Sequence, residues 1–157
     1  MAFEIERKFL VNQALWRALE KPVPLHIVQG YIFDAGPKCC RIRVTDFKEA
    51  VLNIKQEIDA IRRHEFETII PINDAQMLLK EMGESFVEKY RYMIPSGASV
   101  WEVDEFGGAN KGLVVAEIEL PSANATFAMP NWVGDEVTFD NRYLNTNLAK
   151  YPFQLWA

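Results

Sequence analysis

The chain begins with charged side chains at alternate positions, namely Glu4, Glu6 and Lys8. On a β-strand, side chains two residues apart leave from the same face. Two carboxylates and one ammonium group would then project together from one strand. Neighbouring carboxylates bind hard cations such as Mg²⁺, and an adjacent lysine can bind a phosphate oxygen. The segment therefore indicates a site for a metal ion and a phosphate group.

The same alternation recurs in later segments, and the sign of the charge differs from one segment to the next. Residues 41–43 and 89–91 carry only basic charges, whereas 102–104 and 117–119 carry only acidic charges. If these faces converge inside a closed barrel, a polyanion would bind the basic part and divalent metals would bridge it to the acidic part. The alternating charged side chains after residue 8 are Arg41, Arg43, Lys55, Arg63, Glu65, Glu67, Lys89, Arg91, Glu102, Asp104, Glu117 and Glu119.

A simpler interpretation of the alternation is the solvated outer face of an antiparallel sheet, which also carries polar residues at every second position. Periodicity alone favours this interpretation. Two observations argue against it. A surface adapted for solubility intersperses positive and negative charges, whereas here the signs are separated by segment. Uncharged polar residues such as Ser, Thr and Gln are also scarce at these positions.

The overall composition restricts the class of protein. The chain has 157 residues, 49% of them apolar, so one domain spanning 1–157 with a packed core is expected. A net charge of −5 provides no global basic surface for nucleic acid. No apolar run approaches the roughly 18 residues of a transmembrane helix, and no signal-peptide pattern is present. We therefore expect a cytoplasmic protein without nucleic-acid or membrane partners, and the adjacent thiols Cys39 and Cys40 fit a reducing compartment.

Short strands dominate the predicted elements, which favours a sandwich or a barrel. Helices are expected at 13–20, capped by Asn12, at 74–82, capped by Asn73 and stopped by Gly83, and at 141–149. Gly107-Gly108 is expected to form a hairpin turn. The predicted strands are 2–10, 26–34, 38–47, 49–58, 63–71, 85–94, 99–106, 112–121 and 135–139.

The ordered motifs over roughly residues 2–150 resemble those of the CYTH superfamily, the triphosphate tunnel metalloenzymes. Residues 4–8, with Glu4, Glu6 and Lys8, resemble the ExExK motif of this family. One departure is Gln56, since glycine often follows the corresponding lysine in the family. The other matching segments are Gln29-Gly30-Tyr31, Arg41-Ile42-Arg43, Lys55, Glu65-Phe66-Glu67, Lys89-x-Arg91, Trp101-Glu102-Val103-Asp104-x-Phe106, Ala116-Glu117-Ile118-Glu119-Leu120 and Val137-Thr138-x-Asp140-x-Arg142-Tyr143.

The resemblance implies a mainly β fold, an eight-stranded antiparallel barrel with a few flanking helices and with the charged faces lining a tunnel. It also implies Mg²⁺ or Mn²⁺ as cofactor. The phosphate-binding, catalytic residues would be Lys8, Arg41, Arg43, Lys55, Arg63, Lys89 and Arg91. The metal ligands would be Glu4, Glu6, Glu117 and Glu119. A second metal or the attacking water would be held by Glu65, Glu67, Glu102 and Asp104, for which a purely structural ion-pair role is an equal alternative.

The expected function is metal-dependent hydrolysis of a small triphosphate, namely inorganic triphosphate, ATP or thiamine triphosphate. Two alternatives are a class IV-type adenylate cyclase and a non-catalytic protein that binds polyphosphate or nucleotide. Either a monomer or a homodimer is compatible with the composition. Of the other notable residues, His64 is expected to face outward and the four tryptophans to pack against the outer wall. Tyr31 is expected in a hydrogen-bonded wall position rather than at the substrate.

Overall fold

The computed structural model describes residues 2–82 and 86–156. Strands make up most of the fold. They are β1 (Ala2–Val11), β2 (Leu25–Ala35), β3 (Lys38–Thr45), β4 (Glu49–Glu57), β5 (Arg62–Ile70), β6 (Phe86–Ser96), β7 (Ser99–Phe106), β8 (Val114–Glu119) and β9 (Val133–Glu136). The helices are α1 (Gln13–Ala18), α2 (Ile72–Glu81) and α3 (Asn145–Lys150), with 3₁₀ turns η1 (Gly108–Asn110), η2 (Asn141–Tyr143) and η3 (Phe153–Leu155).

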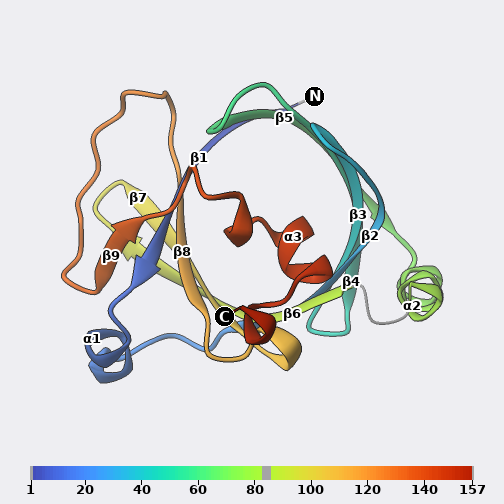
Figure 1. Ribbon diagram of the computed structural model, residues 1–157, viewed down its shortest axis with the longest axis horizontal. Helices are drawn as coiled ribbons and strands as arrows, with labels where there is room; N and C mark the ends of the chain where they lie inside the picture. Colours follow the sequence, from blue (N-terminus) through green and yellow to red (C-terminus); the bar gives the residue numbers. More distant parts are fainter. Residues whose placement is uncertain (1, 83–85, 157) are drawn as a thin grey trace.

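The sheet closes on itself into a barrel. Its strand order is β5-β4-β3-β2-β6-β7-β8-β1, and an additional β5–β1 pairing completes the ring. All these pairings are antiparallel, and β9 joins only β1 from outside the ring. Figure 1 looks into this ring of strands. The eight-stranded antiparallel barrel is therefore confirmed, and a sandwich is excluded.

Two apolar clusters lie outside the barrel wall, between the strands and the segments that flank them, and a third lies inside it, under the C-terminal segment. In β3, Ile42 and Val44 are buried in a cluster with Ala75 of α2. Trp16 of α1 packs with Trp101 and Trp132 on another part of the wall. Because apolar residues alternate with charged ones along each strand, the outward apolar packing turns the charged faces inward.

Two predicted helices differ from the structure at one boundary or more. The helix predicted at 13–20 ends earlier, at Ala18, and the helix predicted at 74–82 begins earlier, at Ile72. Asn12 caps α1 as expected, since its side chain accepts a hydrogen bond from the Leu15 N–H at 3.2 Å. Asn73 is not the cap of α2, because the helix already begins at Ile72 after an extended Pro71. Proline cannot continue strand pairing and suits the start of a helix. The expected stop at Gly83 lies outside the described residues.

The C-terminal segment is broken where one helix was expected. Asp140 caps η2 by accepting from the Arg142 N–H, and Leu144 is extended before α3 begins. The connection after β7 is also longer than a hairpin turn, because Gly107 is followed by η1. In the described part of the chain, no helix is long and apolar enough to cross a membrane.

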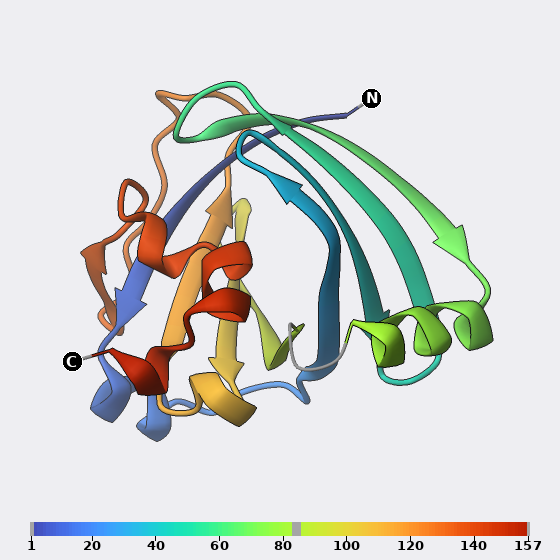
Figure 2. The same ribbon diagram turned by 45° about the vertical axis from the view of Figure 1, so that its right-hand side comes forward.

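The C-terminal segment covers one end of the barrel. In Figure 1, α3 lies within the outline of the strand ring, whereas α1 and α2 lie outside it. In Figure 2 the same segment lies in front of β7 and β8, and its α3 contacts β6 and β2. Leu148 and Tyr143 are buried there in a cluster with Val87 and Phe106. The barrel is thus a tunnel with one end covered by its own chain.

Candidate active site

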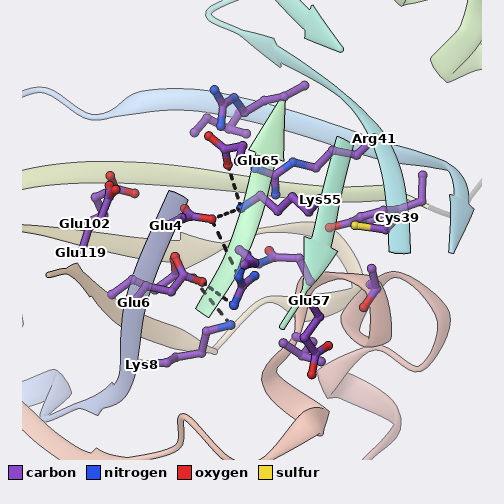
Figure 3. A pocket seen from close by; sticks show the side chains of 18 of the residues that line it. Glu4, Glu6, Lys8, Cys39, Arg41, Lys55, Glu57, Glu65, Glu102 and Glu119 are labelled. Carbon is purple, nitrogen blue, oxygen red and sulfur yellow. Dashed lines mark hydrogen bonds and ion pairs between the residues drawn. The ribbon is translucent and has the colours of Figure 1, made fainter. Parts of the chain in front are cut away.

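The interior of the barrel contains a cavity of about 500 Å³. Figure 3 shows charged side chains projecting into it from several strands. The predicted site residues that line it are Glu4, Glu6, Lys8, Arg41, Arg43, Lys55, Arg63, Glu65, Glu67, Lys89, Arg91, Glu102, Glu117 and Glu119. The interpretation of the alternation as a solvated outer face is therefore wrong. Alternate residues such as His64 are exposed on the outside, as expected.

Asp104 is the predicted site residue that does not line the cavity. Its side chain is only 1% exposed. The Arg91 guanidinium donates to both its oxygens, at 2.8 and 2.9 Å, and Lys89 Nζ lies 2.8 Å away. Burial alone would raise the pKa of Asp104, but Arg91 and Lys89 lower it below its usual value. Asp104 thus holds two basic side chains from a buried position on the same inner face as Glu102.

Carboxylates gather where β1 meets β8, and they repel one another. Glu6 and Glu119 are directly opposite in the strand register, an arrangement that destabilises a sheet. Burial raises the pKa of Glu4 to about 7, with Glu6 and Glu65 adding to the rise and Lys55 opposing it. Burial, Glu6 and Glu65 likewise raise the pKa of Glu119. A bound cation would relieve this repulsion.

These carboxylates fit Mg²⁺ or Mn²⁺, which prefer oxygen ligands. Within residues 2–82 and 86–156, no three acidic, His or Cys side chains already form a metal cage. That is the expected state for Mg²⁺, which usually takes one or two carboxylates and completes its shell with waters and substrate phosphates. Among the predicted acidic site residues, only Glu119 has no ion-pair partner in the described chain.

Glu117 differs from the other predicted metal ligands. Lys8 Nζ lies 3.6 Å from its carboxylate. Although burial raises its pKa, Lys8, Arg91 and Lys89 together lower it far below the usual value. Glu117 is therefore ionised and neutralised by protein cations. In this structure it acts as an ion-pair partner more than as an open ligand.

Most of the basic side chains are paired with carboxylates of nearby strands on the same inner face. Lys55 Nζ lies 3.0 Å from Glu4 and 3.2 Å from Glu65, and Arg63 Nη2 lies 3.2 Å from Glu6. Arg43 approaches Glu67 at 3.5 Å, and Arg91 Nη1 approaches Glu102 at 2.6 Å. These pairs hold the tunnel side chains in position before any ligand is present.

Arg41 is the exception among the basic residues. Within the described ranges, no carboxylate lies within 4.0 Å of its guanidinium. Its Nε atom is buried without a hydrogen-bond partner. A partly buried guanidinium that has no carboxylate partner can gain one by binding an anion. Arg41 is therefore the side chain most available to an incoming phosphate.

The C-terminal segment contributes groups that sequence reasoning missed. The Tyr143 carbonyl accepts a hydrogen bond from Lys8 Nζ at 3.0 Å, and Asn145 Oδ1 accepts from Lys89 Nζ at 3.1 Å. Thr138 and Thr146 line the same cavity. The motif resemblance had extended to this tail, but Lys8 and Tyr143, 135 positions apart in the chain, meet only after the barrel closes.

Comparison with known proteins identifies the family. A family model described as the CYTH domain matches residues 2–150. A protein of Acetivibrio thermocellus named inorganic triphosphatase is 45% identical over 155 residues, covering 98% of this chain and 97% of that protein. A protein of Nitrosomonas europaea with the same name is 36% identical over 151 residues, covering 93% and 96%. The crystal structure of an inorganic triphosphatase aligns with a TM-score of 0.67 at 32% identity and covers 95% of each chain.

The chain therefore belongs to the CYTH domain family. The family resemblance inferred from the ordered motifs is confirmed by the match over residues 2–150. The similarity also extends over nearly the whole length of both named relatives.

Proposed function

We propose that the protein hydrolyses inorganic triphosphate with the help of Mg²⁺ or Mn²⁺. The observation that carries the proposal is the closed tunnel, in which an uncompensated Arg41 lies among paired basic side chains opposite mutually repelling carboxylates. The names of the two relatives, inorganic triphosphatase, support the choice of reaction and substrate.

In this proposal the basic residues bind the phosphate chain. Triphosphate hydrolysis requires positioning and charge neutralisation more than covalent catalysis. Arg41 would bind first, because it has no protein carboxylate to give up. Arg43, Arg63 and Lys55 would exchange part of their carboxylate contacts for phosphate oxygens. Guanidinium groups suit this role because they contact two oxygens at once.

Lys8, Lys89 and Arg91 would act at the covered end of the tunnel. Lys8 and Lys89 are anchored to the C-terminal segment by hydrogen bonds to Tyr143 and Asn145. Their ammonium groups are thereby held in one orientation, which lowers the entropic cost of binding a phosphate there.

Glu4, Glu6 and Glu119 would hold the metal. Glu117 would contribute less to metal binding, because its carboxylate is already paired with Lys8. When bound, the ion would neutralise charge on the phosphate oxygens and lower the pKa of a coordinated water. Of the carboxylates considered for a second ion or for the attacking water, Glu65, Glu67 and Glu102 line the cavity, and each contacts a basic side chain. Asp104 would serve only to hold Lys89 and Arg91, because it is buried beneath them and does not line the cavity.

We also propose that residues 1–157 form a single catalytic domain and that the protein acts in the reducing environment of the cytoplasm. Cys39 and Cys40 are both free thiols, which fits such a compartment.

The proposal is tested by incubating the purified protein with inorganic triphosphate, ATP or thiamine triphosphate, each with Mg²⁺ or Mn²⁺ and with a chelator as control. We expect metal-dependent release of phosphate, fastest from inorganic triphosphate. Formation of cyclic AMP from ATP would instead support the cyclase alternative. Binding of triphosphate without turnover would support a non-catalytic binding protein.

A further inference from the structure

Closure of the barrel leaves one stretch of strand edge open. Strand β1 pairs with only the first four residues of β5, Arg62–Glu65. The rest of β5, Phe66–Ile70, pairs with β4 on one side, and no strand in residues 2–82 and 86–156 pairs with its other side. In Figure 2 this part of β5, the green strand that leads into α2, runs along the right-hand border of the fold. Backbone N–H and C=O groups on that side are therefore free to pair with another chain.

The exposure of the β5 side chains changes at the same point. Arg63 and Glu65, which face inward, are half-buried where β1 lies beside them. Beyond them, every residue from Phe66 to Ile69 is exposed, whichever face it is on. Phe66 is 45% exposed, and Ile69 is 81% exposed although it is on the inward face. The open edge thus carries apolar side chains on both of its faces.

The edge lacks the features that usually prevent strands from pairing between molecules. Native edge strands are short, charged, bulged or interrupted by proline. Strand β9, which also has one neighbouring strand, has only four residues and ends in Asp135 and Glu136. The segment Phe66–Ile70 contains one charged residue and no proline, and its register with β4 is regular. Three of its five residues are β-branched, a type that favours strand pairing.

The open edge is complementary to itself. An antiparallel pairing of two copies about a two-fold axis at Thr68 places the two Thr68 residues opposite each other. Glu67 is then opposite Ile69 of the second copy, and Phe66 is opposite Ile70. Thr–Thr and apolar pairs stabilise an antiparallel ladder, and this register places no like charges opposite each other.

We propose that the open edge of β5, Phe66–Ile70, is a homodimer interface at which two copies of the chain form one continuous antiparallel sheet. The contact is smaller than a standard protein interface, so we expect a weak dimer with a Kd on the order of 1 μM to 100 μM. The inference concerns assembly and does not depend on the proposed reaction.

The test is sedimentation velocity of the wild type and of Thr68→Lys over a range of protein concentrations. Thr68 is on the outer face and does not line the tunnel. The wild type should shift from monomer to dimer, whereas two lysines at the axis should raise the dimer Kd by roughly 10-fold or more. Thr126→Lys is the matched control, because Thr126 is exposed in the loop after β8 and should not affect association. Thermal unfolding checks that each variant is folded.

Mixing two variants tests the register directly. Thr68→Lys and Thr68→Glu should each be monomeric alone, and an equimolar mixture should form a heterodimer, because opposite charges then meet at the axis. A wild type that stays monomeric up to concentrations on the order of 1 mM would overturn the inference. A dimer that Thr68→Lys and Thr126→Lys affect equally would also overturn it, since another surface would then form the contact. So would folded variants that do not associate when mixed.

Discussion

Individual residues of the tunnel differ mainly in whether a protein group already compensates their charge. Glu119 and Arg41 are the predicted acidic and basic site residues without an opposite charge within 4.0 Å in the described chain. Glu117 and Asp104 are at the other extreme, since protein cations lower the pKa of both. Residues of one chemical type in one motif therefore need not share one role. The uncompensated residues are the best candidates for direct contact with the metal and the phosphate.

The Glu119→Gln substitution tests the role of the uncompensated carboxylate. We expect at least a roughly 100-fold loss of kcat and a higher Mn²⁺ concentration for half-maximal activity, because a neutral amide is a poor ligand for a hard cation. The metal-free protein should become more stable by about 0.5 to 1 kcal/mol, because the repulsion with Glu6 is removed. Activity assays and thermal unfolding measure the two effects. Glu81→Gln on the exposed face of α2 is the control, and equal activity in both variants would contradict the assignment.

The pH dependence of stability should report the buried phenol of Tyr31. Its pKa is about 12 in the folded protein and about 10 in the unfolded chain, so the unfolded state loses the proton first as the pH rises. The resulting stabilisation is complete below pH 10 and is lost between about pH 10 and 12, by about 2 to 3 kcal/mol. Denaturant unfolding of the wild type and of Tyr31→Phe at several pH values measures it. A pH-independent difference between the two would refute the expectation.

At the scale of elements, pairs of strands act as supports for one another's functional side chains. Strand β7 supplies Asp104 to Arg91 and Lys89 of β6. The C-terminal segment supplies acceptors to Lys8 of β1 and Lys89 of β6. Lys8, Lys89 and Arg91 are thus each oriented by an element other than their own. Removing a supporting group should therefore affect both the fold and the activity.

The Asp104→Asn substitution removes such a support. It would leave two buried cations without their main counter-charge, and we expect a loss of about 3 to 5 kcal/mol of stability together with most of the activity. Denaturant unfolding and phosphate release measure these losses. Asp59→Asn is the matched control, because Asp59 forms its ion pair with Arg62 on the surface and its loss should change little. Similar stability of the two variants would show that Asp104 is not needed as a buried counter-charge.

At the scale of the whole molecule, the barrel encloses charges that remain only partly neutralised. Glu6 and Glu65 add to the raised pKa values of Glu4 and Glu119, so repulsion between carboxylates remains in the metal-free protein. A metal and a triphosphate together would supply the missing charges of both signs. The structure therefore favours joint binding over binding of either ligand alone.

Joint binding should appear in thermal unfolding. We expect Mn²⁺ and triphosphate together to stabilise the protein by more than the sum of their separate effects. For scale, a single ligand present at 100 times its Kd raises the free energy of unfolding by about 2.7 kcal/mol. Turnover during the measurement is limited by a rapid temperature scan. Addition of a chelator should remove the extra stabilisation. Strictly additive effects would mean that the metal and the phosphate bind independently.

The sequence by itself determined which side chains share a face. Alternation at every second position is a local property of a strand, so Glu4, Glu6 and Lys8 had to project together wherever β1 lay. Strand locations, the cap at Asn12 and the outward direction of His64 followed from the same local rules. Boundaries that depend on neighbouring elements were less predictable. Asn73, for example, lies inside α2 and does not cap it, because the helix already begins after Pro71.

Only the tertiary structure decided which side of the sheet is inside. The same alternation is compatible with a solvated outer face, and the β5–β1 pairing that closes the ring joins strands far apart in the chain. Closure buried Asp104 against Lys89, brought Tyr143 and Asn145 to the buried ammonium groups, and left Arg41 Nε without a hydrogen-bond partner. These contacts depend on the distances between strands. A periodic pattern specifies only which side chains of one strand point to the same face.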